Sequence, residues 1–251
     1  MTTSVVMDTE FAWDPTIDHE GRDTDPEFSP HAPNAIIVSI SYVVLDPESK
    51  TPVELGIVSG GDERERLTQF VRAWSTYPTR LVTFAGRGAD IQLMQARLMR
   101  HMLQAPRFFE SVVDVARFNN EHHLDLYEKL SLYGAQRRGG MSAWARCFGW
   151  PGKMDVDGSS VATMLRDGRE SEVDAYCLCD SVQQAAIYLR TLLSRARIHR
   201  KHYDLLAREL LRVALADERT RRMAERVDVG VWLEGEPRFI EWRKPKAEAA
   251  E

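Results

Sequence analysis

Short apolar runs alternate with amphipathic stretches along this chain, and this pattern predicts a fold that mixes strands and helices. Runs rich in β-branched residues predict strands at residues 4–10, 35–45, 53–59 and 80–84, and a fifth strand is expected at 111–115. Short connections predict that the first three strands form an antiparallel meander. A helical crossover precedes the fourth strand, which is therefore expected to run parallel to the first.

Helices are predicted where apolar residues recur every three or four positions. They are expected at residues 62–77, from residue 90 onward, and at 122–133, 141–148, 159–166, 171–194 and 199–223. Residues 13–34 are expected to form a long acidic surface loop. Residues 149–158 form a glycine-rich turn without phosphate-loop spacing. The segments 229–233 and 238–242 are expected to pair as a hairpin, followed by a frayed tail.

Together these elements predict an α/β domain with a mixed five-stranded sheet over residues 1–205, and a C-terminal helical extension over 206–251. The hydrophobic fraction of 43% is sufficient for a core, and the net charge of −5 does not indicate a general nucleic-acid binder. No apolar run has the length of a membrane span, and no secretory signal is visible. The three cysteines have no zinc spacing, so we expect reduced thiols in a cytoplasmic protein.

Two carboxylates, Asp8 and Glu10, stand one residue apart at the end of the first predicted strand. Side chains alternate across a strand, so both are expected on the same face. Two like charges that close are unfavourable unless a cation or a proton lies between them. The pair therefore predicts half of a site for a hard divalent ion. The structural alternative, a solvated turn, is the commoner meaning of this short motif taken alone.

Two later segments carry further acids. Gly86 and Gly88 end the fourth strand, and Asp90 then opens a helix at the carboxyl end of the sheet, where α/β folds carry their sites. A plain N-cap is the alternative for this residue. Tyr176 and Asp180 are four apart on the long helix and are therefore neighbours on one face.

These residues together resemble the tyrosine form (DEDDy) of the DEDD-superfamily 3′–5′ exonucleases, which have a ribonuclease-H-like fold. Within that superfamily the chain is most similar to the predicted exonucleases related to the proofreading domain of family-B DNA polymerases. The matching motifs are MDTE, TFAGRGADIQLM and YCLCD, with HHLDLYEKLSLYGA and FGWPGK between the last two. The resemblance covers roughly residues 4–205. The chain departs from many relatives at Ala85, Ala89 and Gln92, which bear on base stacking and rate but remove no metal ligand.

The resemblance implies hydrolysis of the terminal phosphodiester of single-stranded DNA at a 3′ end, with release of nucleoside 5′-monophosphates. It implies two divalent ions, Mg²⁺ or Mn²⁺. Asp8 would bridge them, Glu10 and Asp180 would complete one ion, and Asp90 would hold the second largely through water. Tyr176 would orient the attacking water, because a phenol is a poor base at neutral pH.

Four other residues are candidates for gripping the nucleic acid: Thr9, Phe11, Arg87 and Lys153. Phe11 is placed to stack on a base, with core packing as its alternative. Arg87 and Lys153 are placed to hold phosphates, with ordinary surface charge as their alternative.

Two other functions stay open from the sequence. One is an exoribonuclease with the same chemistry, since the 2′-hydroxyl is recognised by local pocket groups. The other is a non-catalytic nucleic-acid-binding accessory subunit, which the three departures favour slightly and the complete set of acids opposes. No polymerase sequence follows, so proofreading within the same chain is not expected. His123 and Asp125 are expected to make structural hydrogen bonds.

Overall fold

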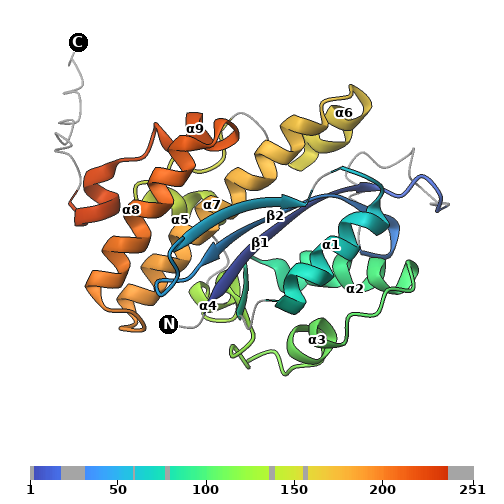
Figure 1. The fold of residues 1–251 in the computed structure, drawn as a ribbon, viewed down its shortest axis with the longest axis horizontal. Coiled ribbons are helices and arrows are strands. Elements are labelled where there is room, and N and C mark those ends of the chain that lie inside the picture. Colours follow the sequence, from blue (N-terminus) through green and yellow to red (C-terminus); the bar gives the residue numbers. More distant parts are fainter. Residues whose placement is uncertain are drawn as a thin grey trace, which may run out of the picture.

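A mixed five-stranded sheet of order β3-β2-β1-β4-β5 lies between two helical layers (Figure 1). The computed structural model describes residues 3–17, 32–58, 60–76, 80–135, 139–154 and 158–236. The strands are β1 (Ser4–Trp13), β2 (Ala35–Leu45), β3 (Val53–Val58), β4 (Arg80–Thr83) and β5 (His123–Asp125).

The strand directions confirm the predicted mixed sheet. β1 pairs antiparallel with β2, and β2 pairs antiparallel with β3. β4 runs parallel to β1, and β5 runs parallel to β4. β1 continues three residues beyond the predicted strand, with a shift of register between Glu10 and Phe11. The beginning of the expected loop is therefore part of the sheet, while residues 18–31 lie outside the described part of the chain.

The fifth strand is not at residues 111–115, where the apolar run predicted it. That segment belongs to the π-helical turn η3 (Phe109–Val113), which follows α3 (Pro106–Phe108) and buries Val112. β5 instead uses His123–Asp125, and the shorter helix α4 (Leu126–Leu130) follows it directly. A three-residue strand is too short to show a period, and a short apolar run fits a buried helical turn equally well.

The remaining helices follow the predicted pattern, with one division. They are α1 (Glu63–Thr76), α2 (Asp90–Arg100), α5 (Met141–Cys147), α6 (Val161–Arg166), α7 (Glu170–Ser194), α8 (Arg200–Ala216) and α9 (Glu218–Ala224). The single helix expected over 199–223 is divided at Asp217, which is extended and whose side chain accepts a hydrogen bond from the Arg219 N–H. Asp217 thereby caps the second helix.

The expected C-terminal hairpin is wrong in its first half. Gly230–Glu234 forms the π-helical turn η5, and residues 238–242 lie outside the described part. Shorter 3₁₀ turns occur at Ala32–Asn34 (η1), Gly86–Gly88 (η2) and Gly158–Ser160 (η4). Within the described residues, no helix has the length and hydropathy needed to cross a membrane.

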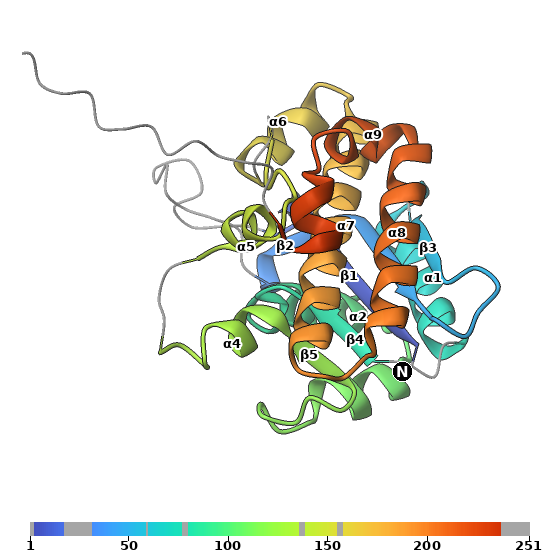
Figure 2. The ribbon, with the colours of Figure 1, turned by 90° about the vertical axis from the view of Figure 1, so that its left-hand side faces the viewer.

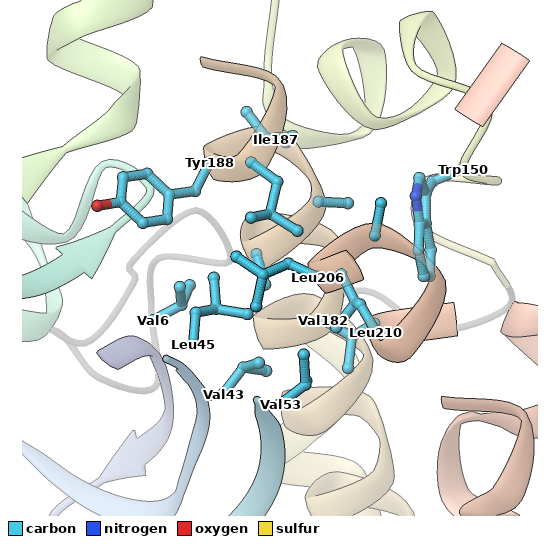
Figure 3. Close-up of a cluster of buried hydrophobic side chains, with 14 of the residues drawn as sticks. Val6, Val43, Leu45, Val53, Trp150, Val182, Ile187, Tyr188, Leu206 and Leu210 are labelled. Atoms are coloured by element: carbon cyan, nitrogen blue, oxygen red, sulfur yellow. The ribbon is translucent and has the colours of Figure 1, made fainter. Parts of the chain in front are cut away.

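Two hydrophobic cores lie on the two faces of the sheet. Val5 and Met7 of β1 pack with α1 and α2 on one face, whereas Val6 packs with α7 and α8 on the other. Figure 3 shows the second core, where side chains of the sheet meet Val182 of α7 and Leu206 and Leu210 of α8. A division at residues 205/206 would fall inside α8, in this core, and the two-part organisation stays a prediction.

Buried hydroxyl groups fix α7 along β1 and β2. Ser41 Oγ of β2 donates to the Cys177 carbonyl at 2.7 Å and lies 2.7 Å from Ser181 Oγ. Further along the helix, the Tyr188 hydroxyl lies 3.0 Å from Ser4 Oγ of β1. Because buried polar groups are costly when unpaired, these contacts specify the position of α7 along the sheet.

A buried arginine joins α2 to β1 and α1 on the other face. Arg97 is 2% exposed and donates to Asp14 at 2.7 Å and to Glu63 at 2.6 Å. Burial alone would raise the pKa of Asp14, but hydrogen bonds from Thr16 and Arg97 hold it at about 2. Asp14 therefore stays charged at neutral pH and keeps its partner.

We predict that Arg97→Met lowers the free energy of unfolding by about 3–5 kcal/mol, because two buried carboxylates lose their cation. Urea denaturation followed by circular dichroism measures the change. Arg195→Met, at the exposed end of α7, is the matched control and should change stability by less than about 0.5 kcal/mol. Equal stability of the two variants would contradict the prediction.

Candidate functional site

Asp8 and Glu10 project from the same face of β1, as predicted. They share that face with Val6, which packs on the α7 side. Glu10 is 8% exposed and Asp8 is half-buried. One carboxylate oxygen from each lies within 4.8 Å of the other, and both lie within 4.8 Å of Cys177 Sγ.

Helix α7 brings Asp180 to these acids. Asp180 and Asp8 both line a cavity of about 390 Å³, and Asp180 is 5% exposed. One turn further along, Gln184 Nε2 donates to Asp8 Oδ1 at 2.7 Å. Sequence reasoning missed Gln184, although the four-residue spacing that paired Tyr176 with Asp180 reaches it one turn later.

Asp90 joins the group through Thr9. Asp90 is the first residue of α2, and the N-cap is Ala89, so the alternative of a plain N-cap does not hold. Asp90 Oδ1 accepts the Thr9 N–H at 3.1 Å and the Thr9 hydroxyl at 2.5 Å. Thr9 thus ties the start of α2 to the acidic end of β1.

The turn before α2 needs glycine at one position. A Cβ on Gly86 would lie 2.5 Å from Thr83 Cβ and 2.7 Å from Asp90 Oδ2. Ala85, just before it, has a left-handed backbone with φ of 62°. Asp125 holds this turn, because its carboxylate accepts the N–H groups of Ala85 at 3.1 Å and of Arg87 at 2.9 Å.

The expected structural roles of His123 and Asp125 are confirmed. His123 Nε2 lies 3.0 Å from Thr83 Oγ1, and burial lowers the pKa of His123 to about 3. Asp125, besides holding the turn, caps α4 by accepting the Glu128 N–H at 3.1 Å. Both residues therefore support the strand ends beneath the acids.

The electrostatics of the acids favour a bound cation. Burial, and then the charges of Asp90, Asp180 and Glu10, raise the pKa of Asp8 well above its usual value. Burial and Asp180 raise the pKa of Glu10 to about 8. Burial also raises the pKa values of Asp90 and Asp180 to about 6 each. Carboxylate oxygens that repel one another in this way are the donors that hard divalent cations prefer.

Lys153 and Tyr176 lie together at the edge of this group. Lys153 Nζ donates to the Tyr176 hydroxyl at 2.6 Å and lies 3.9 Å from Asp180 Oδ2. Burial, followed by the charge of Asp180, raises the pKa of Tyr176 far above its ordinary value. The Tyr176 hydroxyl therefore keeps its proton at neutral pH and can orient a neighbouring group.

The other residues proposed to grip nucleic acid have protein partners. Thr9 is buried on Asp90. Phe11 is half-buried against the core under α1 and α2. Arg87 Nε lies 3.2 Å from Glu128 Oε2, with its side chain 18% exposed. Of the four, Thr9 and Lys153 lie next to the acids, and the nucleic-acid roles of all four stay predictions.

The cysteines are free, and two of them point in different directions as expected. Cys177 Sγ lies 3.5 Å from the Asp8 carbonyl, whereas Cys179 Sγ lies 3.6 Å from the Arg219 carbonyl of α9. The two thiols therefore do not form a shared metal site.

A family model described as predicted 3′-5′ exonuclease related to the exonuclease domain of PolB matches residues 26–228. The chain belongs to this family. The matched region contains Asp90, Tyr176 and Asp180 and begins after Asp8 and Glu10.

The fold is similar to that of a solved structure, the family B DNA polymerase from the hyperthermophilic archaeon Pyrobaculum calidifontis. The TM-score is 0.55 at 15% sequence identity, over 93% of this chain and 28% of the polymerase. The chain thus spans 28% of the length of that enzyme. The likeness confirms the predicted fold class, an α/β fold with a mixed five-stranded sheet of the ribonuclease-H-like kind. No protein with a curated description matches this exonuclease-family chain in sequence.

We predict that Gly86→Ala destabilises the protein by about 1–3 kcal/mol and displaces Asp90, because the new methyl group overlaps Thr83 and Asp90. Gly88→Ala is the matched control in the same turn, since none of the described atoms lies within 4 Å of a Cβ there. Thermal unfolding of both variants, each with and without Mn²⁺, measures the effect. Similar melting temperatures for the two variants would show that the turn accepts a side chain at residue 86.

We also predict that Asp180→Asn raises the melting temperature of the metal-free protein by about 2–4 °C, equivalent to about 1 kcal/mol, because it removes a charge that burial disfavours. Wild type should gain stability on adding Mn²⁺, whereas this variant should gain little. Asp114→Asn, at an exposed position, should behave as wild type. A Mn²⁺ response that is unchanged in Asp180→Asn would exclude Asp180 from the cation site.

Proposed function

We propose that this family member is a metal-dependent 3′–5′ exonuclease of the DEDDy type that degrades single-stranded DNA to nucleoside 5′-monophosphates. The proposal rests on four carboxylates that three separate segments bring together, namely Asp8, Glu10, Asp90 and Asp180. The Lys153–Tyr176 pair stands beside them. The three free cysteines fit a protein of the reducing cytoplasm, which is the location we propose.

The residues present fit a pair of divalent cations. Asp8, Glu10 and Asp180 offer oxygen atoms in a buried group whose mutual repulsion a cation would relieve. Asp90 presents less, because both Thr9 donors occupy its Oδ1. We therefore assign the first three residues to direct contact and Asp90 to contact largely through water, with either Mg²⁺ or Mn²⁺.

When bound, two such cations supply Lewis acidity: they neutralise charge on the phosphate and acidify the attacking water. Hydrolysis forms a bond from the water oxygen to the terminal phosphorus. It breaks the bond from that phosphorus to the 3′ oxygen of the preceding nucleotide, which leaves with a proton. The chain itself must position the water and the phosphate.

Tyr176 and Lys153 are placed for this positioning. The Tyr176 hydroxyl keeps its proton, so it acts by donating a hydrogen bond and not as a base. Lys153 fixes that hydroxyl and brings a positive charge to within 3.9 Å of Asp180. A phosphate that approaches Asp180 would meet this charge.

Two alternatives are weaker. DNA is favoured over RNA because the family is described through the exonuclease domain of a DNA polymerase and the similar structure is a DNA polymerase. A non-catalytic accessory role drew support from Ala85, Ala89 and Gln92, but all three are exposed. Their side chains can change the surface that meets a base, while the carboxylates keep their partners.

We predict that the purified protein shortens a 5′-labelled single-stranded DNA 20-mer one nucleotide at a time from its 3′ end, only with Mg²⁺ or Mn²⁺. Asp8→Ala should lower the rate by at least about 10³-fold, because it removes the central ligand. Asp114→Ala is the matched control for loss of an acid. Gel separation of the products, with an RNA 20-mer of the same sequence in parallel, measures both rates.

The outcomes of this assay separate the alternatives. Faster shortening of RNA would make the protein an exoribonuclease. Absence of metal-dependent shortening of either strand would refute the enzyme and support the accessory role.

A further inference from the structure

A second and larger cavity, of about 650 Å³, adjoins the carboxylates on the outer side of α7. Its lining comes from α6, α7, α9 and the loop at residues 152–154. Figure 2 shows these three helices on the same side of the molecule. Lys153 and Asp180 line both this cavity and the smaller one that contains Asp8. The two cavities therefore lie on either side of one lysine–aspartate pair, at the proposed point of hydrolysis.

Cations outnumber acids around the larger cavity. Arg169 stands at the start of α7, Arg219 and Arg222 stand on α9, and Lys153 stands on the loop, whereas its acids are Glu172 and Asp180. This local excess contrasts with the net charge of −5 for the whole chain.

Two of these arginines pair with acids at or near the surface. Arg169 pairs with Glu172 at 2.7 Å, with side chains 44% and 52% exposed. Arg219 pairs with Asp217 at 2.6 Å, with side chains 37% and 19% exposed. Exposed ion pairs contribute little to stability, so these arginines can turn toward a polyanion at small cost.

The lining of the cavity includes a buried amide whose oxygen lacks a partner among the described residues. Gln183 lies one turn after Asp180 and is 1% exposed, and its Oε1 has no hydrogen-bond partner among the residues that the structure describes. A buried polar atom without a partner is unfavourable, and a ligand that pairs with it would recover that loss. Met154, Met164 and Cys179 supply an apolar surface around it. A nucleic-acid base has this combination of apolar faces and N–H groups at its edge.

We propose that the single strand reaches the carboxylates through this cavity, with Arg169, Arg219 and Arg222 binding backbone phosphates and the Gln183 amide hydrogen-bonding a base. This inference rests on the proposed function for its choice of nucleic acid. Three arginines on two walls exceed what the single phosphate of a mononucleotide needs, so the occupant is a strand. The terminal nucleotide would then lie beyond the lysine–aspartate pair, in the smaller cavity beside Phe84 and Met141.

The proposal gives α9 a role in substrate binding. Helix α9 lies in the segment expected from the sequence to be a C-terminal extension, and it contributes Arg219, Arg222 and Met223 to the cavity. Removing charge from α9 should therefore weaken binding of a strand even where no cation or hydrolysis is involved.

The test measures binding of a 5′-fluorescein-labelled dT₁₅ oligomer by fluorescence anisotropy. EDTA removes divalent cations, and the KCl concentration is varied from about 25 to about 200 mM. The number of phosphate contacts determines how steeply the affinity falls with salt. The Arg219→Gln/Arg222→Gln double variant should bind about 5- to 20-fold more weakly at the lowest salt. Its slope of log affinity against log salt should fall by about 1.4, or 0.7 for each lost phosphate contact. The matched control is Arg195→Gln/Arg197→Gln, which removes the same charge at the exposed far end of α7 and should keep the wild-type slope.

Two further variants separate the proposal from a folding defect. Arg222→Gln is also measured alone, since it leaves the Arg219–Asp217 ion pair at the start of α9 intact, and it should lower the slope by about 0.7. Gln183→Leu keeps every cation, so its slope should stay unchanged. It should bind dT₁₅ about 3- to 10-fold more weakly but should bind an abasic 15-mer as wild type does.

Equal slopes for the α9 variants and the α7-end control would overturn the proposal, as would binding of poly-glutamate as tightly as dT₁₅. If the wild type shortens oligomers and the α9 variants bind normally, the route through this cavity is refuted and the proposed exonuclease stands. A wild type that binds through these arginines but hydrolyses nothing refutes the proposed exonuclease alone.

Discussion

Gathering four carboxylates, three of them buried and one half-buried, is electrostatically unfavourable, and the rest of the fold must hold them there against their repulsion. The stabilisation comes from the apolar side of α7. Val182, Ala185 and Leu189 are fully buried against the sheet and α8. Each buried aliphatic side chain contributes about 1.5–3 kcal/mol, so the core can offset the cost of the acids. The fold tolerates the repulsion between the acids because the helix that carries Asp180 is also the most deeply buried helix in the described part of the chain.

The same helix must therefore place Asp180 beside the other acids on one face and bury its apolar side chains on another. An α-helix turns about 100° per residue, so a slip of one position would move Asp180 away from Asp8 and would also expose the core positions. Two independent sets of contacts oppose such a slip. The hydroxyl of Ser41 binds both the Cys177 carbonyl and Ser181, and Gln184 holds Asp8 from the adjoining turn. The position of the acids is thus fixed by contacts of α7 with both β1 and β2.

The sequence predicted the features that depend on a period. The two-residue period of a strand placed Asp8 and Glu10 on one face, and the bounds of β2 were predicted correctly. The features it missed depend on contacts between distant segments. β5 is a strand because three residues pair with β4, and α8 ends where the Asp217 side chain caps the next helix. Gln184 was missed because a glutamine on a buried helix has no distinctive pattern until Asp8 lies 2.7 Å away.

Ala85, Ala89 and Gln92, where the chain differs from many relatives, bear on whether the acids serve catalysis. Ala85 adopts a left-handed backbone that costs a non-glycine residue about 1 kcal/mol, and Asp125 holds it there through two N–H groups of the turn. The next residue, Gly86, is at a position where a side chain would overlap Asp90, and there the chain has the glycine that the turn needs. The changes therefore fall on exposed positions of this turn and of α2, and none of them replaces a carboxylate. A protein that only bound nucleic acid would bring phosphates to a group of repelling acids, which weakens binding unless cations lie between them. These acids therefore favour nucleic-acid binding only where cations lie between them and the phosphates.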